Sequence, residues 1–269
     1  MKKAVVFLLS LLLALSGCGE TATTPFRVID TVGVRRYCLL YRLDDRIIPQ
    51  VDAAMNALAL RGTLSAVSLR WMGRDVITLK GTRGAAAEAP PAEDPEPEPE
   101  ETQRRRLIVG VERDFPPMAY EENGVLRGMS VEIAEALGEE LGWEVALQPI
   151  GPEEVGTQLA SGNIDCALGF DPASVREGRY SIGPGYMESD VVVAVRSASP
   201  LRRLRDIGGA RIGTVNDPVI AAVLKNSEKV TRYASGATVY LSLQRCLNAL
   251  DNGWCAAVAM DRLMLQRLQ

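Results

Sequence analysis

Continuous apolar runs alternate with amphipathic stretches along the chain from residue 107 onward. The amphipathic stretches predict helices at residues 131–141, 153–160 and 239–250. Two more helices are expected after Asp217, a cap residue followed by proline, and after Asp261. Together with the runs, which are typical of buried strands, these helices predict an α/β fold with mostly parallel sheets. The runs cover residues 107–111, 145–148, 164–169, 190–195, 211–215 and 256–260.

The front of the chain predicts a different order of elements, one strand followed by two helices. Residues 36–43 are almost continuously apolar and predict a buried strand. Residues 48–60 carry apolar side chains at helical spacing, and Gly62 follows as a helix-ending residue. A second helix is expected at residues 64–71.

The first residues have the pattern of a secretory leader. Lys2 and Lys3 precede an apolar run at residues 4–15, which is shorter than the roughly 20 residues that span a bilayer. The run ends in Leu-Ser-Gly-Cys at residues 15–18, which resembles the bacterial lipobox. Residues 1–17 are therefore predicted to be a lipoprotein signal peptide, Cys18 the lipidated residue and residues 18–25 a tether, on the extracytoplasmic face of the cell membrane. The alternative is an ordinary signal peptide with Cys18 near its cleavage site by chance.

Residues 82–106 are predicted to be a linker. Their central stretch, residues 88–101, contains seven acidic residues and five prolines and no apolar periodicity, so it cannot bury a core. The overall charge of −4 gives no basic surface for nucleic acid. The chain has no histidine, which excludes Ser-His-Asp and Cys-His catalysis and imidazole metal sites. None of the five cysteines forms a CxxC pair, so neither a metal nor a cofactor is expected.

Six segments between residues 106 and 261 carry a family resemblance. They are residues 106–120, 128–133, 162–165, 176–186, 206–213 and 252–261. In this order and spacing they resemble the bacterial extracellular solute-binding proteins of family 3, which bind polar amino acids for ABC transporters. The resemblance implies a two-lobed α/β fold of the periplasmic-binding-protein type II, each lobe a mostly parallel sheet flanked by helices.

The last part of this family's chain resembles the front of this one. Its returning strand and C-terminal helices match residues 26–29, 37–41 and 48–73, which predicts a circular permutant. Residues 26–43 would then supply a strand and hinge to lobe 2, and residues 44–81 the last helices of lobe 1. Lobe 1 would otherwise comprise residues 107–186 and lobe 2 residues 187–269, with hinge crossings near 36–41 and 186–191. The alternative is a truncated tandem with a partial upstream domain.

The resemblance also implies roles for residues in the cleft between the lobes. Arg176 matches the arginine that grips a ligand's α-carboxylate, and Asp261 the carboxylate that takes its α-ammonium. Glu112 matches a position that senses the ligand's side chain. Phe115 and Tyr120 would form walls of the pocket. Each residue also has an alternative interpretation without a ligand. Arg176 would be a surface arginine, Asp261 a helix cap and Glu112 a solvated loop acid. The two aromatic residues would pack in the core.

Other cleft positions depart from the family's pattern. Asp171 lies where the family usually has a hydroxyl, and an aspartate there would repel a carboxylate. The loop with Asn216 and Asp217 replaces a turn rich in glycine and threonine. These departures leave the identity of the ligand open. Cys246 and Cys255 are candidates for a disulfide, with two buried free thiols as the alternative.

The function that follows is a lipid-anchored binding protein, not an enzyme. It is expected to be a monomer that captures a small polar solute, an amino acid above all, and delivers it to an ABC transporter permease. One alternative is a sensor that reports the ligand to a partner protein. The other is a dehydratase on the same fold, with Glu112 or Asp171 as its acid.

Overall fold

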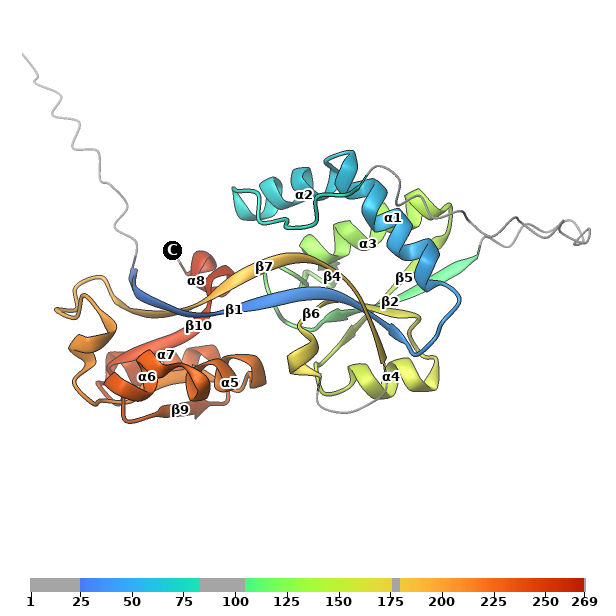
Figure 1. Cartoon of the computed structure of the whole chain (residues 1–269). Coiled ribbons are helices and arrows are strands. Elements are labelled where there is room, and N and C mark those ends of the chain that lie inside the picture. Colours follow the sequence, from blue (N-terminus) through green and yellow to red (C-terminus); the bar gives the residue numbers. More distant parts are fainter. Residues whose placement is uncertain (1–24, 83–104, 176–179, 269) are drawn as a thin grey trace, which may run out of the picture.

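One sheet of eight strands runs through the whole molecule (Figure 1). The computed structural model describes residues 25–82, 105–175 and 180–268; the predicted leader with Cys18, most of the linker and Arg176 lie outside these ranges. The strand order is β5-β2-β6-β1-β7-β10-β8-β9. The strands are β1 (Phe26–Arg42), β2 (Arg106–Glu112), β5 (Glu144–Ile150), β6 (Cys166–Phe170), β7 (Tyr180–Arg196), β8 (Ile212–Val215), β9 (Ala237–Tyr240) and β10 (Ala257–Asp261). A separate hairpin contains β3 (Tyr120–Glu122) and β4 (Val125–Arg127).

Two long strands, β1 and β7, connect the two ends of this sheet and are called the crossing strands below. They pair antiparallel over their whole length, from Phe26 opposite Arg196 to Arg42 opposite Tyr180. The last third of β1 also pairs with β6, whereas the last third of β7 pairs with β10. Each crossing strand therefore belongs to both ends of the molecule, and its middle lies between them (Figure 1).

Lobe 1 is built on the parallel strands β5, β2 and β6. Its helices are α1 (Ile48–Leu60), α2 (Thr63–Met72), α3 (Met129–Leu141) and α4 (Val155–Ser161), with the 3-10 turn η1 (Pro172–Ser174). The first three cover one face of the sheet, where α1 and α2 pack on α3 (Figure 1). The second face is covered by α4 and has its own apolar cluster. Lobe 1 is thus a three-layered α/β unit.

Lobe 2 repeats this plan on the parallel strands β10, β8 and β9. Its helices are α5 (Pro218–Asn226), α6 (Glu228–Tyr233), α7 (Leu243–Asp251) and α8 (Arg262–Arg267), with the 3-10 turn η2 (Leu204–Ile207). One face buries a cluster under α5, α6 and η2, and the other a cluster under α7 and α8. The predicted α/β class with mostly parallel sheets is confirmed, with the crossing strands as the antiparallel element. Within the described ranges, no helix has the length and apolarity that crossing a bilayer requires.

The front of the chain is an integral part of both lobes. Phe26 lies in an apolar cluster of lobe 2 together with Leu265 of α8. The stripe predicted on residues 48–60 is buried, because Val51 and Met55 of α1 have no exposed surface and lie in the main cluster of lobe 1. The front segment therefore supplies β1, which runs through both lobes, and the helices α1 and α2, which belong to lobe 1 alone.

Both ends of the linker lie against the same helix. The side chain of Asn56 exchanges hydrogen bonds with the backbone of Thr82, and Arg105 donates to Gln50 at 3.3 Å. Asn56 and Gln50 both belong to α1, and six residues of helix span about 9 Å. The linker therefore begins and ends close together on lobe 1.

The predicted helix at residues 239–250 is wrong at its start. Residues 237–240 form β9, which pairs with β8, and α7 begins only at Leu243. Ser242 caps this helix, because its hydroxyl accepts a hydrogen bond from the backbone N–H of Arg245. The apolar Val239 is compatible with either a helix or an edge strand. In the structure it pairs with Thr214 of β8, so this segment is a strand.

Candidate functional site

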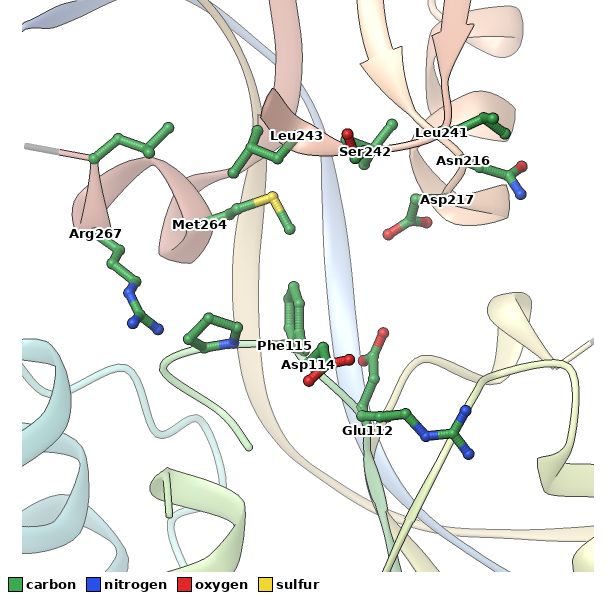
Figure 2. Close-up of a pocket in the computed structure, with 14 residues that line it drawn as sticks. Glu112, Asp114, Phe115, Asn216, Asp217, Leu241, Ser242, Leu243, Met264 and Arg267 are labelled. Atoms are coloured by element: carbon green, nitrogen blue, oxygen red, sulfur yellow. The ribbon is translucent and has the colours of Figure 1, made fainter. Parts of the chain in front are cut away.

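A cavity of about 580 Å³ opens between the two lobes beside the crossing strands (Figure 2). Glu112 at the end of β2 and Phe115 just after that strand reach it from lobe 1, and Asn216 and Asp217 reach it from the loop after β8 in lobe 2. Helix α8 adds Met264 from above, as drawn in Figure 2. The carboxyl ends of parallel strands from both lobes thus meet at one place, which is where open α/β sheets bind ligands. The remaining lining residues are Arg113, Asp114, Pro116, Val215, Leu241, Ser242, Leu243, Arg267 and Leu268.

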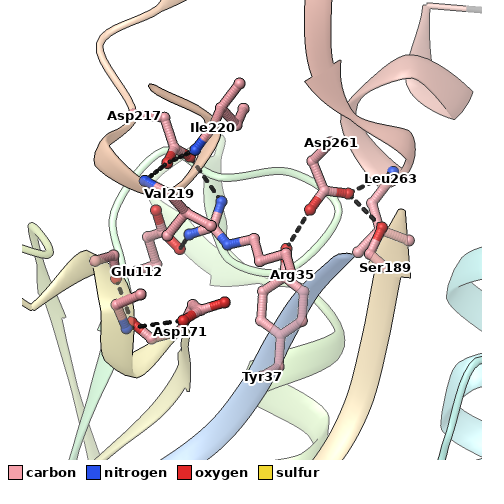
Figure 3. Close-up of polar contacts among 12 residues, drawn as sticks. Arg35, Tyr37, Glu112, Asp171, Ser189, Asp217, Val219, Ile220, Asp261 and Leu263 are labelled. Atoms are coloured by element: carbon pink, nitrogen blue, oxygen red, sulfur yellow. Dashed lines mark hydrogen bonds and ion pairs between the residues drawn. The ribbon is translucent and has the colours of Figure 1, made fainter. Parts of the chain in front are cut away.

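Asp217 connects the N-terminus of α5 to the crossing strand β1. One carboxylate oxygen accepts from the backbone N–H groups of Val219 at 2.8 Å and Ile220 at 3.2 Å, which confirms the predicted helix cap. The other oxygen accepts from Nη1 of Arg35 at 2.8 Å (Figure 3). The same carboxylate therefore fixes a helix of lobe 2 and pairs with a cation that extends from β1.

Glu112 is the lobe 1 counterpart of Asp217. It is the last residue of β2, and its carboxylate lies 3.4 Å from Nη2 of the same Arg35. The pKa of Glu112 is raised to about 7, chiefly because the side chain is buried; Arg35 opposes this shift, and the carboxylates of Asp217 and Asp261 add to it. One guanidinium does not compensate all of these acids, so the proton stays on Glu112 up to near-neutral pH.

Asp261 has no exposed surface and lies among donors of the protein itself. One oxygen accepts from the hydroxyl of Tyr37 at 2.8 Å; the other accepts from the hydroxyl of Ser189 at 2.5 Å and from the backbone N–H of Leu263 at 2.8 Å (Figure 3). Its predicted role as a helix cap is confirmed. Burial raises the pKa of Asp261, and Arg35 and these hydrogen bonds oppose that shift.

Asp171 and Tyr120, both predicted as site residues, are not among the residues that line the cavity. Asp171 caps η1 through Ala173 and accepts from the backbone N–H of Arg36, both at 2.8 Å, so it ties η1 to β1. Tyr120 contacts Trp71 edge to face at 6.2 Å between ring centroids, and Arg267 lies over its ring. Phe115, in contrast, both lines the cavity and stacks on Tyr37 at 6.4 Å.

Cys246 and Cys255 are free, buried thiols in the structure. The sequence analysis left this open as the alternative to a disulfide. Both sulfur atoms lie beside Gly213, where a side-chain carbon would come within 2.9 Å of one and 3.1 Å of the other. Burial raises the pKa of the Cys246 thiol to about 12, with the neighbouring Cys255 as a second cause. A raised pKa keeps the thiol protonated and unreactive.

Sequence reasoning missed Arg35, Tyr37 and Ser189, which organise the acids of the site. All three lie in the middle of the crossing strands, with Arg35 directly opposite Ser189. A signal was present, because Arg35 is two residues before the buried Tyr37 and side chains two apart share a face of a strand. A short strand prediction beginning at residue 36 left Arg35 outside it.

We expect Tyr37→Phe to destabilise the protein by about 1–3 kcal/mol. The substitution removes the donor to a carboxylate oxygen that no solvent reaches, so the buried Asp261 loses a hydrogen bond that water cannot replace. Urea denaturation measures the change. Tyr41→Phe is the matched control, because the Tyr41 hydroxyl donates to Asp52 at 2.6 Å and Asp52 is half-exposed, so water can replace it. Equal costs for the two variants would contradict the importance of the buried cluster.

Two α/β lobes, two crossing strands and a cavity between the lobes define the molecule as a two-lobed binding-protein fold. The chain belongs to the bacterial extracellular solute-binding proteins, family 3, whose model matches residues 107–257, a little more than half of the chain. The expected family is thereby confirmed.

Curated relatives match over a limited stretch. The arginine-binding extracellular protein ArtP of Bacillus subtilis (strain 168) is 27% identical over 114 residues, which are 42% of this chain and 45% of the relative. The L-cystine-binding protein TcyJ of Escherichia coli (strain K12) is 28% identical over 115 residues, or 41% of this chain and 43% of the relative. The chain therefore spans less than half the length of these relatives.

Similar solved structures match more of the chain at lower identity. Holo ArgBP from T. maritima has a TM-score of 0.45 and 21% identity, covering 60% of this chain and 71% of that one. The ancestral amino acid-binding protein AncCDT-1, a precursor of cyclohexadienyl dehydratase, has a TM-score of 0.47 and 20% identity, covering 58% and 70%.

Proposed function

We propose that this protein captures an amino acid in the cavity between its lobes and delivers it to an ABC importer. The observation that carries the proposal is the cavity itself, because it lies at the carboxyl ends of strands from both lobes of a family 3 solute-binding protein. Its volume of about 580 Å³ falls in the range of roughly 300–1,000 Å³ for small-molecule sites. An amino-acid ligand is also what the names of the arginine- and cystine-binding relatives suggest for this chain.

The crossing strands would act as the hinge of this capture. Their middle, around Arg35 and Ser189, lies between the part of β1 that pairs with β6 and the part of β7 that pairs with β10. Closure of two lobes around a ligand needs only a few residues that absorb the motion. We propose that the lobes move about this point and that Cys18 carries the lipid that keeps the protein at the membrane.

Binding without catalysis is part of the proposal. Glu112 is an acid with a pKa near 7 in the cavity wall, as a dehydratase would need. However, its carboxylate faces Arg35, and Asp217 is committed both to Arg35 and to the cap of α5. A role in holding the two lobes accounts for both acids.

We also propose that the order of the elements is circularly permuted. Three arrangements support this: β1 lies between β6 and β7, α1 and α2 pack on α3, and both linker ends contact α1. A linker that closes a short gap within one lobe is what a join between former chain ends requires.

A thermal-shift screen of the twenty amino acids tests the function. A ligand at 100 times its dissociation constant stabilises the folded state by about 2.7 kcal/mol, which raises the Tm of a chain of this size by roughly 5–10 °C. We expect a rise of this order with one or a few amino acids. No shift with any of them would contradict the proposed ligand class.

Arg176→Ala should weaken that ligand's binding about 100-fold or more, if the residue grips the α-carboxylate as the sequence resemblance implies. Isothermal titration measures the dissociation constants. Arg179→Ala is the matched control, since it removes an arginine three positions away that is not the one matching the family's ligand-binding arginine. Similar affinities in the two variants would show that Arg176 is not the carboxylate partner.

A further inference from the structure

Arg35 is a buried cation beside the cavity, and three of the residues that it contacts line that cavity. Only 1% of Arg35 is exposed, while Glu112, Asp217 and Phe115 around it line the cavity. Burying a charge costs free energy unless partners compensate for it. The neighbours of Arg35 therefore show what kind of group this side of the cavity is built to hold.

The partners of Arg35 are those that a cationic ligand would need. Asp217 accepts from Nη1 at 2.8 Å and Glu112 from Nη2 at 3.4 Å. The guanidinium carbon lies 5.1 Å from the ring centroid of Phe115 and 5.2 Å from that of Tyr37, within the distance for cation–π attraction. The Asp217 carboxylate, the oxygen of Glu112 and two aromatic faces form a site for a planar cation.

These partners also come from opposite sides of the cavity. Glu112 ends a strand of lobe 1, whereas Asp217 caps a helix of lobe 2 (Figure 3). A ligand that closes a two-lobed protein bridges its lobes in the same way. Arg35 extends from the middle of β1, between the lobes, and makes this bridge from within the chain.

We propose that Arg35 is an internal ligand that occupies the cation subsite of the cavity, so that the protein rejects amino acids with guanidinium or ammonium side chains and accepts those without a cationic side chain. The proposal rests on the proposed function only in taking the cavity as the amino-acid site. The acids that would pair with a ligand's cationic side chain are already engaged by Arg35. A second guanidinium would have to displace Arg35 and leave it buried without a partner, which is strongly unfavourable.

The test is chemical rescue of Arg35→Ala by methylguanidinium. We expect about 10 mM methylguanidinium to raise the Tm of this variant by about 2–4 °C and to leave the wild type unchanged. L-Arginine should bind the variant at least tenfold more tightly than the wild type. Arg36→Ala is the matched control, because Arg36 is the next residue on β1 and pairs with Glu188 at 3.0 Å on the surface; it should behave like the wild type.

Two outcomes overturn the proposal. The first is a wild type that binds L-arginine as tightly as Arg35→Ala does. The second is an Arg35→Ala protein that gains nothing from methylguanidinium, and an unfolded variant that methylguanidinium does not refold counts in the same way. Arg35→Met is the second variant for the same probes, because its apolar side chain preserves contact with the two rings.

The proposed function can fail separately. A wild type that binds none of the twenty amino acids contradicts capture of an amino acid, yet methylguanidinium rescue of Arg35→Ala still supports the internal ligand. Conversely, a wild type that binds L-arginine tightly supports the function and overturns the internal ligand.

Discussion

A chain that consists of residues 107–268 alone should not fold. It lacks β1, the strand between β6 and β7, so the eight-stranded sheet is divided into two parts that no longer share hydrogen bonds. It also lacks α1 and α2, which leaves the outer face of α3 uncovered. Each part then exposes an unpaired strand edge, β6 in one part and the 17-residue β7 in the other, which promotes aggregation. Circular dichroism and size-exclusion chromatography should find an aggregated or largely unfolded protein.

The same residues in a different order should restore the fold. The matched control is residues 107–268, a flexible spacer and then residues 26–82, the order that the family resemblance implies. A short spacer of about eight residues spans on the order of 15 Å, which suffices because Phe26 shares an apolar cluster with Leu265 near the end of α8. This protein should unfold cooperatively and bind the same amino acid as the natural order. A stable, ligand-binding 107–268 fragment, or a reordered chain that fails to fold, would contradict the permutation.

The sequence predicted the elements best where burial and capping agreed. The helix at residues 48–60 was predicted with its observed bounds, because an apolar stripe precedes the glycine at position 62. The helices after Asp217 and Asp261 were predicted from their caps, and both carboxylates do cap in the structure. These signals are local, so the sequence displays them completely.

The crossing strands were predicted too short, for a reason that lies in the fold. The strand expected at residues 36–43 is the last part of β1, which begins at Phe26. Its first half contains Asp30, Thr31 and the exposed Val34, so it has no continuous apolar run. What makes this half a strand is pairing with β7, a contact between residues more than 150 positions apart.

The candidate site shows the same division between local and distant signals. Phe115, Asn216, Asp217 and Glu112 were predicted as site residues and do line one cavity. Arg35 was not predicted, because its two carboxylate partners come from distant segments that meet only in the folded molecule. An arginine beside apolar residues on a strand gives no indication in the sequence that two acids surround it.

Glu112→Gln should remove much of the loss of stability that accompanies a rise in pH from about 5 to 8. In the folded protein burial raises the pKa of Glu112 to about 7, compared with 4.5 for an ordinary glutamate. Between these two values the folded state holds a proton that the unfolded state has released. Stability therefore falls as the pH rises through this window, by about 3 kcal/mol in total. Glutamine is neutral throughout and resembles the protonated acid in shape, so this contribution is absent from the variant.

The measurement is the free energy of unfolding of both proteins by urea at several pH values. Asp261, whose pKa is also raised by burial, contributes to the pH dependence of both proteins and cancels in the difference between them. At pH 5 the two should be similar in stability, which serves as an internal control for the substitution itself. At pH 8 the variant should be the more stable by up to about 3 kcal/mol, because the wild type then carries a second buried carboxylate next to a guanidinium already paired with Asp217. Parallel curves would mean that Glu112 is ionised throughout the window and that Arg35 compensates both acids.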